Sequence, residues 1–244
     1  MNNRGLFITG TDTDVGKTLI TAGIVRWLRS QWIDVVPVKP VQTGAEKKGD
    51  ILVAPDLEFC LSASGLQPGL DEKRWMSPYL YEPACSPHLA GRIAGRYPDI
   101  SIIQKYIELI LRRRQAVVVE GAGGIMVPLN ENETMLDLMK ALNYPVVLVS
   151  RIGLGAVNHA LLSINTLTAA GLGLAGIIFN QNLPPVTENK YIEEDNPVII
   201  SRFGKVRVLG NIDYFDNTIP LEEMWRRFEQ SMPGLEYLKE VVKR

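Results

Sequence analysis

The sequence has few cysteines and almost no net charge. Its 244 residues include two cysteines, Cys60 and Cys85, which are too few for a disulfide framework and predict two reduced, buried thiols in a cytosolic protein. Lys and Arg number 26 against 27 Asp and Glu, so the chain lacks the positive field that holds most nucleic-acid-binding proteins on a polyanion. Because 46% of the residues are apolar, the composition excludes a disordered chain.

Long apolar runs are also missing near the N-terminus, where Leu6-Phe7-Ile8 stops at Thr9 and Gly10, far short of a signal peptide. Residues 152–187 carry no Asp, Glu, Lys or Arg and are long enough for a membrane span. However, two glycines divide this segment, and polar side chains recur through it at Asn158, His159, Ser163, Asn165, Thr166 and Thr168. We therefore predict a buried helix followed by a buried strand, with no membrane association and a cytoplasmic location.

Short apolar runs alternate with helical patterns along the chain. The runs are rich in Val and Ile and show little alternation, which is typical of strands covered on both faces: Gly5–Thr9, Val35–Val38, Ala116–Val119, Val146–Val149, Ala175–Phe179 and Val206–Leu209. Helical spacing predicts helices over Thr18–Arg29, Ile102–Arg114, Met135–Leu142, Ala156–Ala169, Tyr191–Phe203 and Leu221–Phe228. Alternating strands and helices indicate an α/β fold with a doubly wound, mainly parallel sheet. We find no repeat or linker, and Trp75–Pro87 reads as an ordered excursion, so residues 1–244 are predicted to form one domain.

The first predicted strand leads into a glycine-bounded loop, residues 10–18, and then directly into a helix. Such a loop points backbone N–H groups at an anion, Lys17 can reach β- and γ-phosphates, and the Thr18 hydroxyl can bind Mg²⁺. The strict pattern has four residues between its glycines; here five separate Gly10 from Gly16, so Thr11 stands at the usual first glycine. The sequence predicts a phosphate-binding loop.

The two aspartates of this loop, Asp12 and Asp14, would repel a nucleotide if they faced it. One interpretation is that they lie beside a cationic or amine-bearing co-substrate. The other is that they are solvated turn formers. The sequence does not separate the two.

A second lysine and an acidic residue also follow predicted strands. Lys39, fixed by the next proline, is predicted to project into the crevice beyond the strand ends and to stabilise charge on a γ-phosphate together with Lys17. Glu120 ends the Val117–Val119 run before a glycine-rich turn, which indicates a carboxylate beside the metal. Asp56 follows Ala54-Pro55, and its local pattern favours an N-cap over a Mg²⁺ ligand.

These motifs together resemble the dethiobiotin synthetase family, in that family's order and over residues 7–210. The segments that carry the resemblance are residues 10–18, 39–44, 82–88, 119–124 and 155–159. The resemblance implies a P-loop NTPase fold and an ATP-dependent ligase that closes a ureido ring on 7,8-diaminopelargonic acid with CO₂. A carbamate and a carbamic-phosphoric anhydride would be the intermediates. It also implies Mg²⁺ and a homodimer with sites at the subunit interface.

The resemblance also assigns residues to roles. Lys17 and Lys39 would be catalytic, and Thr18, Asp56 and Glu120 would bind Mg²⁺, which overrules the cap for Asp56. Nucleotide contacts would come from Asp14, Val15, Gly16, Lys17, Thr18, Leu19, Glu120, Gly121, Ala122, Gly123, Asn180 and Gln181, the last two on the base. Thr11 and Thr43 would contact the diamine. The partner subunit would hold the substrate carboxylate through Gly155, Ala156, Val157 and Asn158, with Tyr191 nearby.

The chain departs from the dethiobiotin synthetase pattern at one segment, and two other families with a phosphate loop fit it less well. Asn211, Ile212 and Asp213 lie where the family commonly has Ile-Pro, and they are predicted to contact the nucleotide in place of that segment. Because the residues differ, the resemblance does not imply a strict preference for ATP. Partitioning and septum-site ATPases carry a second lysine four residues before the last loop glycine, but this chain has Asp12 there. An amide-forming synthase of the cobyrinate type would need an amidotransferase half with a nucleophilic cysteine, and this chain is too short for one.

Overall fold

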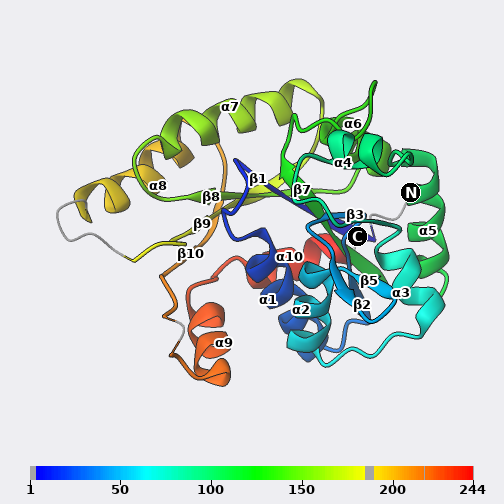
Figure 1. The fold of residues 1–244 in the computed structure, drawn as a ribbon. Helices are drawn as coiled ribbons and strands as arrows, with labels where there is room; N and C mark the ends of the chain where they lie inside the picture. The colour runs from blue at the N-terminus through cyan, green and yellow to red at the C-terminus, as the bar shows by residue number, and fades with distance from the viewer. Residues whose placement is uncertain (1–3, 185–189, 217, 244) are drawn as a thin grey trace.

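A six-stranded parallel sheet forms the centre of the computed structural model, which describes residues 4–184, 190–216 and 218–243. The strand order is β10-β9-β8-β1-β7-β2. The strands are β1 (Gly5–Gly10), β2 (Val35–Val38), β7 (Ala116–Gly124), β8 (Val146–Arg151), β9 (Leu174–Asn180) and β10 (Val208–Ile212). This arrangement confirms the predicted α/β fold with a parallel sheet, and Figure 1 shows the sheet between two layers of helices.

All six predicted strands are present, and their bounds agree within two residues except in β7 and β10. β2 has the predicted bounds, whereas β10 lies further along the chain than the predicted Val206–Leu209 run. β7 continues past Glu120 to Gly124, so Glu120 lies within a buried strand and not at its tip. Gly121, Gly123 and Gly124 have no side chains, so this last part of β7 can run close to β1, where Gly124 pairs with Gly10.

Helices cover both faces of the sheet (Figure 1). One face carries α1 (Lys17–Ser30), α2 (Pro55–Ser64), α9 (Leu221–Gln230) and α10 (Leu235–Val242). The other carries α4 (Pro87–Ile93), α5 (Ile100–Leu111), α6 (Met135–Leu142), α7 (Ala156–Ala169) and α8 (Lys190–Gly204), while α3 (Leu70–Met76) contacts α5 and β2. Helices on both faces explain why the strands are apolar along their whole length.

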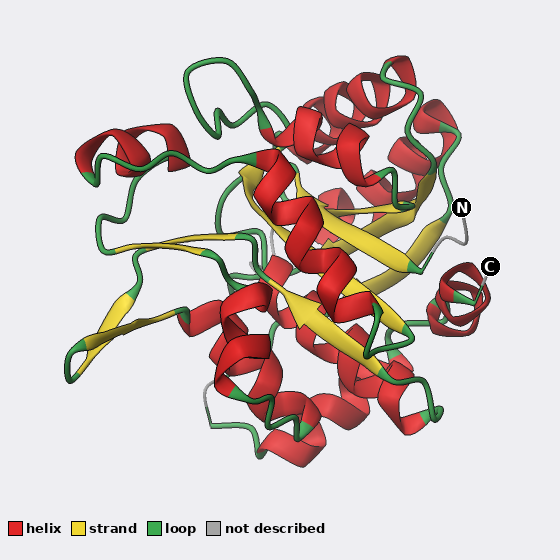
Figure 2. Ribbon diagram, turned by 90° about the vertical axis from the view of Figure 1, so that its right-hand side faces the viewer, coloured by secondary structure: helices red, strands yellow, loops and turns green. Residues whose placement is uncertain are grey.

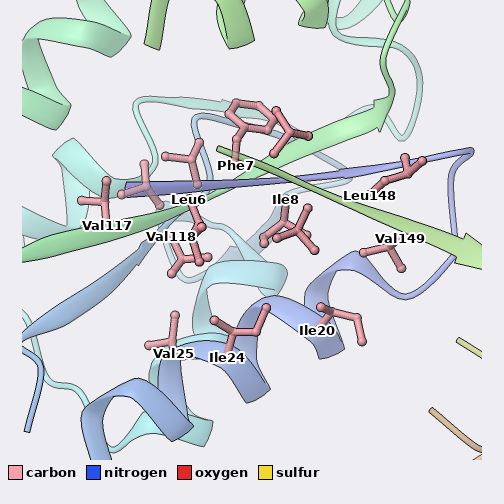
Figure 3. Close-up of a cluster of buried hydrophobic side chains, with 14 of the residues drawn as sticks. Leu6, Phe7, Ile8, Ile20, Ile24, Val25, Val117, Val118, Leu148 and Val149 are labelled. Carbon is pink, nitrogen blue, oxygen red and sulfur yellow. The ribbon is translucent and has the colours of Figure 1, made fainter. Parts of the chain in front are cut away.

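The core between the sheet and α1 fixes the position of the phosphate loop. Leu6 and Ile8 of β1 point toward α1, whose Ile20 and Ile24 face them, and Phe7 points to the opposite side of the sheet (Figure 3). All five side chains are fully buried. Because the loop joins β1 to α1, this packing anchors both of its ends.

The uncharged segment 152–187 forms a helix and a strand as predicted, in α7 and β9. β9 is buried, but α7 buries only one side, through Ala160, Ile164 and Leu167, and Leu162 is 58% exposed. The prediction of a buried helix is therefore wrong for the outer face of α7. Residues 185–187 lie outside the described part. No described helix has the length and apolar character needed to cross a membrane.

Two short sheets lie beyond the main one. β3 (Val41–Thr43) pairs in parallel with β6 (Tyr79–Tyr81), and β4 (Glu46–Lys48) pairs with β5 (Ile51–Val53) in a hairpin that extends from the body at the left of Figure 2. The Trp75–Pro87 excursion is ordered, as predicted, because it contributes β6. The β3–β6 pairing brings the residues after β6 to the carboxyl end of β2.

The two cysteines are not paired with each other. Cys60 is buried and Cys85 is half-buried, and both are free thiols. The prediction of two reduced thiols is confirmed, but the prediction that both are buried is wrong for Cys85.

Candidate active site

A cavity of about 870 Å³ opens at the carboxyl ends of β1, β2 and β7. Open parallel sheets bind ligands in a crevice beyond the carboxyl ends of their strands, at the point where the strand order reverses. Its walls come from the phosphate loop, the segment after β2, the start of α2, the residues after β6 and the last part of β7. The lining residues are Thr13, Asp14, Gly16, Lys17, Thr18, Lys39, Val41, Gln42, Thr43, Gly44, Pro55, Asp56, Ala84, Cys85, Ser86, Pro87, Glu120, Ala122, Gly123 and Val127.

The phosphate loop has the backbone of an anion-binding nest. Asp14 and Gly16 both have left-handed φ angles, 56° and 94°. A Cβ atom on Gly16 would lie 2.1 Å from Asn180 Nδ2, so only glycine fits there. α1 starts at Lys17 with no side-chain hydrogen bond capping it, which leaves its first N–H groups for a ligand.

The two lysines differ in their partners. Lys17 is 7% exposed, and its ammonium donates to the backbone oxygen of Asp12 at 2.8 Å. Lys39 is 6% exposed, and its Nζ lies 2.7 Å from Glu120 Oε1 and 2.7 Å from Asp56 Oδ2. Lys39 is therefore held between two carboxylates, whereas Lys17 has only a neutral partner.

Glu120 and Asp56 complete this cluster. Glu120 is 2% exposed, and its Oε1 accepts a hydrogen bond from the Thr18 hydroxyl at 2.8 Å. Asp56 does not cap α2, whose N-cap is Ala54. The N-cap favoured by the local sequence pattern is therefore wrong, because the Asp56 carboxylate turns to Lys39 instead.

Burial and charge shift the two lysines in opposite directions. Burial, together with the charge of Lys39, lowers the pKa of Lys17 to about 8. Burial would also lower the pKa of Lys39, but the adjacent Glu120 and Asp56 carboxylates outweigh it and raise that pKa above its ordinary value. Lys39 is thus a permanent cation, while Lys17 changes its charge within the range of mildly basic solutions.

The same cluster offers oxygen ligands for a metal ion. The Thr18 hydroxyl and the Glu120 and Asp56 carboxylates are the hard donors that Mg²⁺ prefers. Across residues 4–184, 190–216 and 218–243, no group of three or more His, Cys, Asp or Glu side chains could hold a metal ion by itself. The donor set therefore fits a Mg²⁺ ion that also takes oxygens from a bound phosphate chain, as is usual at nucleotide sites.

Comparisons with known proteins match this geometry. Residues 4–221 match a family model described as an AAA domain. The chain is 39% identical over 212 residues to the ATP-dependent dethiobiotin synthetase of Halalkalibacterium halodurans, across 86% of this chain and 85% of that protein. It is 36% identical to the synthetase of Anoxybacillus flavithermus, across 92% of this chain and 98% of that protein. The chain belongs to the dethiobiotin synthetase family. It is a ligase, as the motif resemblance predicted.

Solved structures with the same fold come from other P-loop proteins. The septum site-determining protein MinD of Pyrococcus horikoshii superposes with a TM-score of 0.57 at 16% identity, across 98% of this chain and 94% of that one. A ParA family ATPase from Chlorobium tepidum gives 0.52 at 16% identity, across 98% and 97%. At such identity these likenesses show the fold alone, and they confirm the predicted P-loop architecture.

The cavity contains about half of the residues that the dethiobiotin synthetase resemblance assigned. Those that line it are Asp14, Gly16, Lys17, Thr18, Lys39, Thr43, Asp56, Glu120, Ala122 and Gly123. Val15, Leu19 and Gly121 adjoin them in the chain. Thr11 does not line the cavity, and its buried hydroxyl has no hydrogen-bond partner among the described residues. Thr13 lines it instead.

The residues expected at the nucleotide base lie outside the cavity, beside the phosphate loop. Asn180 is 3% exposed, and its Nδ2 donates to the Val15 oxygen at 3.0 Å. The Gln181 amide donates to Glu193 Oε1 at 3.1 Å. Ile212 is 2% exposed, so its side chain faces the core, whereas Asn211 and Asp213 are exposed. Base contacts by this group remain a prediction.

The segment expected to bind the substrate carboxylate is also separate from the cavity. Gly155, with a φ of 86°, precedes α7, and residues 155–158 do not line the cavity. Leu154 beside it is 84% exposed and Tyr191 is 69% exposed. Within one chain, the dethiobiotin synthetase fold therefore leaves this segment facing outward.

Ten cavity residues were not predicted as site residues from the sequence. They are Thr13, Val41, Gln42, Gly44, Pro55, Ala84, Cys85, Ser86, Pro87 and Val127. Residues 84–87 reach the cavity because β6 pairs with β3, a contact between distant parts of the chain. The 82–88 segment was one of those that carry the family resemblance, but no role in the site was assigned to its residues.

Proposed function

We propose that this protein is a dethiobiotin synthetase that uses ATP to close a ureido ring on 7,8-diaminopelargonic acid with CO₂, the penultimate step of biotin biosynthesis. The observation that carries the proposal is the Lys39 ammonium, buried between Glu120 and Asp56 in the same cavity as the phosphate loop. A phosphate loop alone serves many NTPases. A second buried cation beside it supplies what a reaction through an acyl phosphate needs, namely charge stabilisation at an oxygen that receives the γ-phosphate.

Ring closure proceeds in three steps. One amine of the substrate adds to CO₂ and loses a proton, which gives a carbamate. A carbamate oxygen takes the γ-phosphoryl group of ATP, and ADP leaves. The second amine then attacks the carbonyl carbon of this mixed anhydride, loses a proton and expels phosphate, which closes the ring.

The residues of the cavity have distinct tasks in these steps. Lys17 and the N–H groups of the loop hold the phosphate chain, while Lys39 stabilises negative charge on the carbamate and on the transferring phosphoryl group. Mg²⁺, held by Thr18, Asp56 and Glu120, would neutralise charge on the β- and γ-phosphates. The Thr43 hydroxyl, across the cavity, would hold the diamine.

The test is incorporation of labelled bicarbonate into an acid-stable product, with ATP and with or without the diamine. We expect label in the product, and release of phosphate, only when both ATP and the diamine are present. Steady ATP hydrolysis that ignores the diamine and gives no acid-stable label would contradict the proposal. That result would favour a switch ATPase like the structural neighbours.

The magnesium assignment gives a prediction for Glu120. Glu120→Gln removes a metal-binding charge at the buried end of the cluster, so the half-saturating Mg²⁺ concentration should rise by about 10-fold. ATP affinity should weaken with Mg²⁺ present and change little in EDTA, as measured by calorimetry. The matched control is Glu72→Gln, a buried carboxylate 2.7 Å from Arg114 and outside the cavity. An unchanged Mg²⁺ requirement in Glu120→Gln would refute the assignment.

We further propose a homodimer in which α7 of one subunit completes the site of the other. Three features of the described residues support it. The start of α7 provides free N–H groups suited to a carboxylate. That start lies outside its own chain's cavity. The surface around it is apolar, with Leu154, Leu162 and Val198 more than half exposed.

Mixed dimers test the shared site. Asn158→Asp, at an exposed position, should repel the substrate carboxylate and raise the KM for the diamine by about 10-fold, while ATP binding stays unchanged. Lys17→Ala chains are expected to lose ATP binding at the phosphate loop but to keep an intact start of α7. Mixing the two at equal amounts, with the diamine kept well below its KM, should restore about a quarter of the wild-type activity, because half of the dimers carry one intact composite site. If mass spectrometry shows mixed dimers and activity does not return, each subunit holds a complete site of its own.

A further inference from the structure

Two asparagines at the end of β9 hold the backbone of the phosphate loop. Asn180 is the last residue of β9, and its Nδ2 donates to the backbone oxygen of Val15 at 3.0 Å. Asn182, two residues later, donates from Nδ2 to the backbone oxygen of Asp14 at 2.7 Å. Asn180 is buried and Asn182 is exposed. Two successive carbonyl groups of the loop are therefore fixed from a distant strand.

Fixing these carbonyl groups also fixes the direction of two N–H groups. In a trans peptide the C=O and N–H bonds point in opposite directions, and the described residues contain no cis peptide bond. The carbonyl of Asp14 shares a peptide with the N–H of Val15, and the carbonyl of Val15 shares one with the N–H of Gly16. With both carbonyl groups bonded to asparagines at the end of β9, the N–H groups of Val15 and Gly16 point away from those side chains. Asp14 and Gly16, on either side of Val15, line the cavity.

The loop also packs tightly against Asn180. A Cβ on Gly16 would meet the Asn180 amide nitrogen at 2.1 Å, so the loop backbone and this side chain are in direct contact. If a peptide of the loop rotated, the Val15 carbonyl would lose its partner and would point its partial negative charge toward the anion. Both changes are unfavourable, the first because a buried acceptor is left unpaired.

We propose that Asn180 and Asn182 are positioning residues that hold the phosphate loop in its anion-binding conformation. This role differs from the base contact that the family resemblance implies for Asn180, because it acts through the hydrogen bond from Nδ2 to the loop backbone. The inference rests on the proposed function in one respect: the loop must bind a phosphate chain.

Inorganic tripolyphosphate separates the two roles because it has phosphates but no base. Asn180→Leu keeps a similar volume, removes the donor and adds no charge. We expect it to weaken the binding of Mg²⁺–ATP and Mg²⁺–tripolyphosphate by the same factor, about 10-fold, as measured by calorimetry. Asn182→Ala, at an exposed position that does not endanger folding, should weaken both by about threefold.

The matched control is Asn196→Leu. Asn196 is also buried, and its Nδ2 also donates to backbone oxygens, those of Ile152 and Gly153. This variant should lower the melting temperature about as much as Asn180→Leu but leave tripolyphosphate affinity unchanged. The comparison distinguishes a specific effect on the loop from general loss of stability.

The outcomes are distinct. If Asn180→Leu weakens ATP binding and leaves tripolyphosphate binding intact, the side chain acts on the base and the proposal is wrong. Unchanged affinity for both ligands in Asn180→Leu and Asn182→Ala also overturns it. If Asn180→Leu does not fold, Asn182→Ala decides alone. A wild-type protein that binds neither ligand refutes the proposed function together with this inference, whereas the first two outcomes leave the proposed function standing.

Discussion

Replacing Lys39 with methionine is expected to lower kcat for ring closure by about 10²–10³-fold while Mg²⁺–ATP still binds with near-normal affinity. The ammonium is the only described lysine group placed between Glu120 and Asp56. In the proposed mechanism it stabilises charge that develops during phosphoryl transfer, so its loss should act on the transition state more than on the bound nucleotide. The two freed carboxylates remain available to the metal, which preserves binding when Mg²⁺ is present. Single-turnover incorporation of labelled bicarbonate measures the first quantity, and calorimetry measures the second.

The same substitution leaves Glu120 as an uncompensated charge in a buried position. Breaking a buried ion pair in this way costs about 3–5 kcal/mol of unfolding free energy. The double variant Lys39→Met/Glu120→Gln should therefore recover stability in urea without recovering kcat. Lys73→Met, which removes a half-exposed ion pair with Glu58, is the control and should keep full activity. Equal losses of ATP affinity and kcat in Lys39→Met would mean that Lys39 only binds phosphate.

The sequence predicts the sheet and its main helices because their signals are local. The valine-rich run at Val35–Val38 and the helical spacing over Met135–Leu142 and Ala156–Ala169 have the bounds of β2, α6 and α7. The β3–β6 pair escaped prediction because each strand has three residues and its partner lies far along the chain. α3 was missed for a related reason, since a seven-residue helix shows too few turns for a clear period.

Some residues of the candidate site could be predicted from local sequence signals, and others could not. Lys17 follows β1 and Lys39 follows β2, and only β7 lies between these two strands. The rule for parallel sheets places residues at the carboxyl ends of such strands together. The local pattern around Asp56 favoured an N-cap, because an acidic residue at the start of a helix commonly caps it, and only the folded chain brings its carboxylate to Lys39. The resemblance assigned Thr11 to the diamine, whereas the folded loop brings Thr13 to the cavity.

Replacing Lys17 with alanine is expected to weaken ATP binding by about 10²–10³-fold and to abolish measurable turnover without unfolding the protein. Its ammonium is buried beside the loop, and removing one partner of a desolvated charge pair with phosphate costs about 2–5 kcal/mol. The only side-chain hydrogen bond of Lys17 among the described residues goes to the neutral Asp12 carbonyl, so its removal leaves no charge unpaired. The melting temperature should therefore stay close to that of the wild type, in contrast to Lys39→Met. Normal turnover in Lys17→Ala would remove the phosphate-loop assignment.

The lowered pKa of Lys17 adds a signature that alanine cannot show. With a pKa of about 8 in the free protein, the side chain is charged below pH 8 and increasingly neutral above it. Binding a phosphate chain favours the charged form, so ATP binding above pH 8 must be accompanied by proton uptake and should weaken by up to about tenfold per pH unit. Arginine at position 17 stays charged in mildly basic solution. The ATP affinity of Lys17→Arg should therefore vary much less than that of the wild type between about pH 7.5 and 9.5, roughly the range in which Lys17 titrates. Because the metal and the nucleotide titrate identically in both proteins, the difference between the two profiles reports Lys17 alone. Parallel profiles would show that Lys17 stays charged throughout and that its burial does not control nucleotide binding.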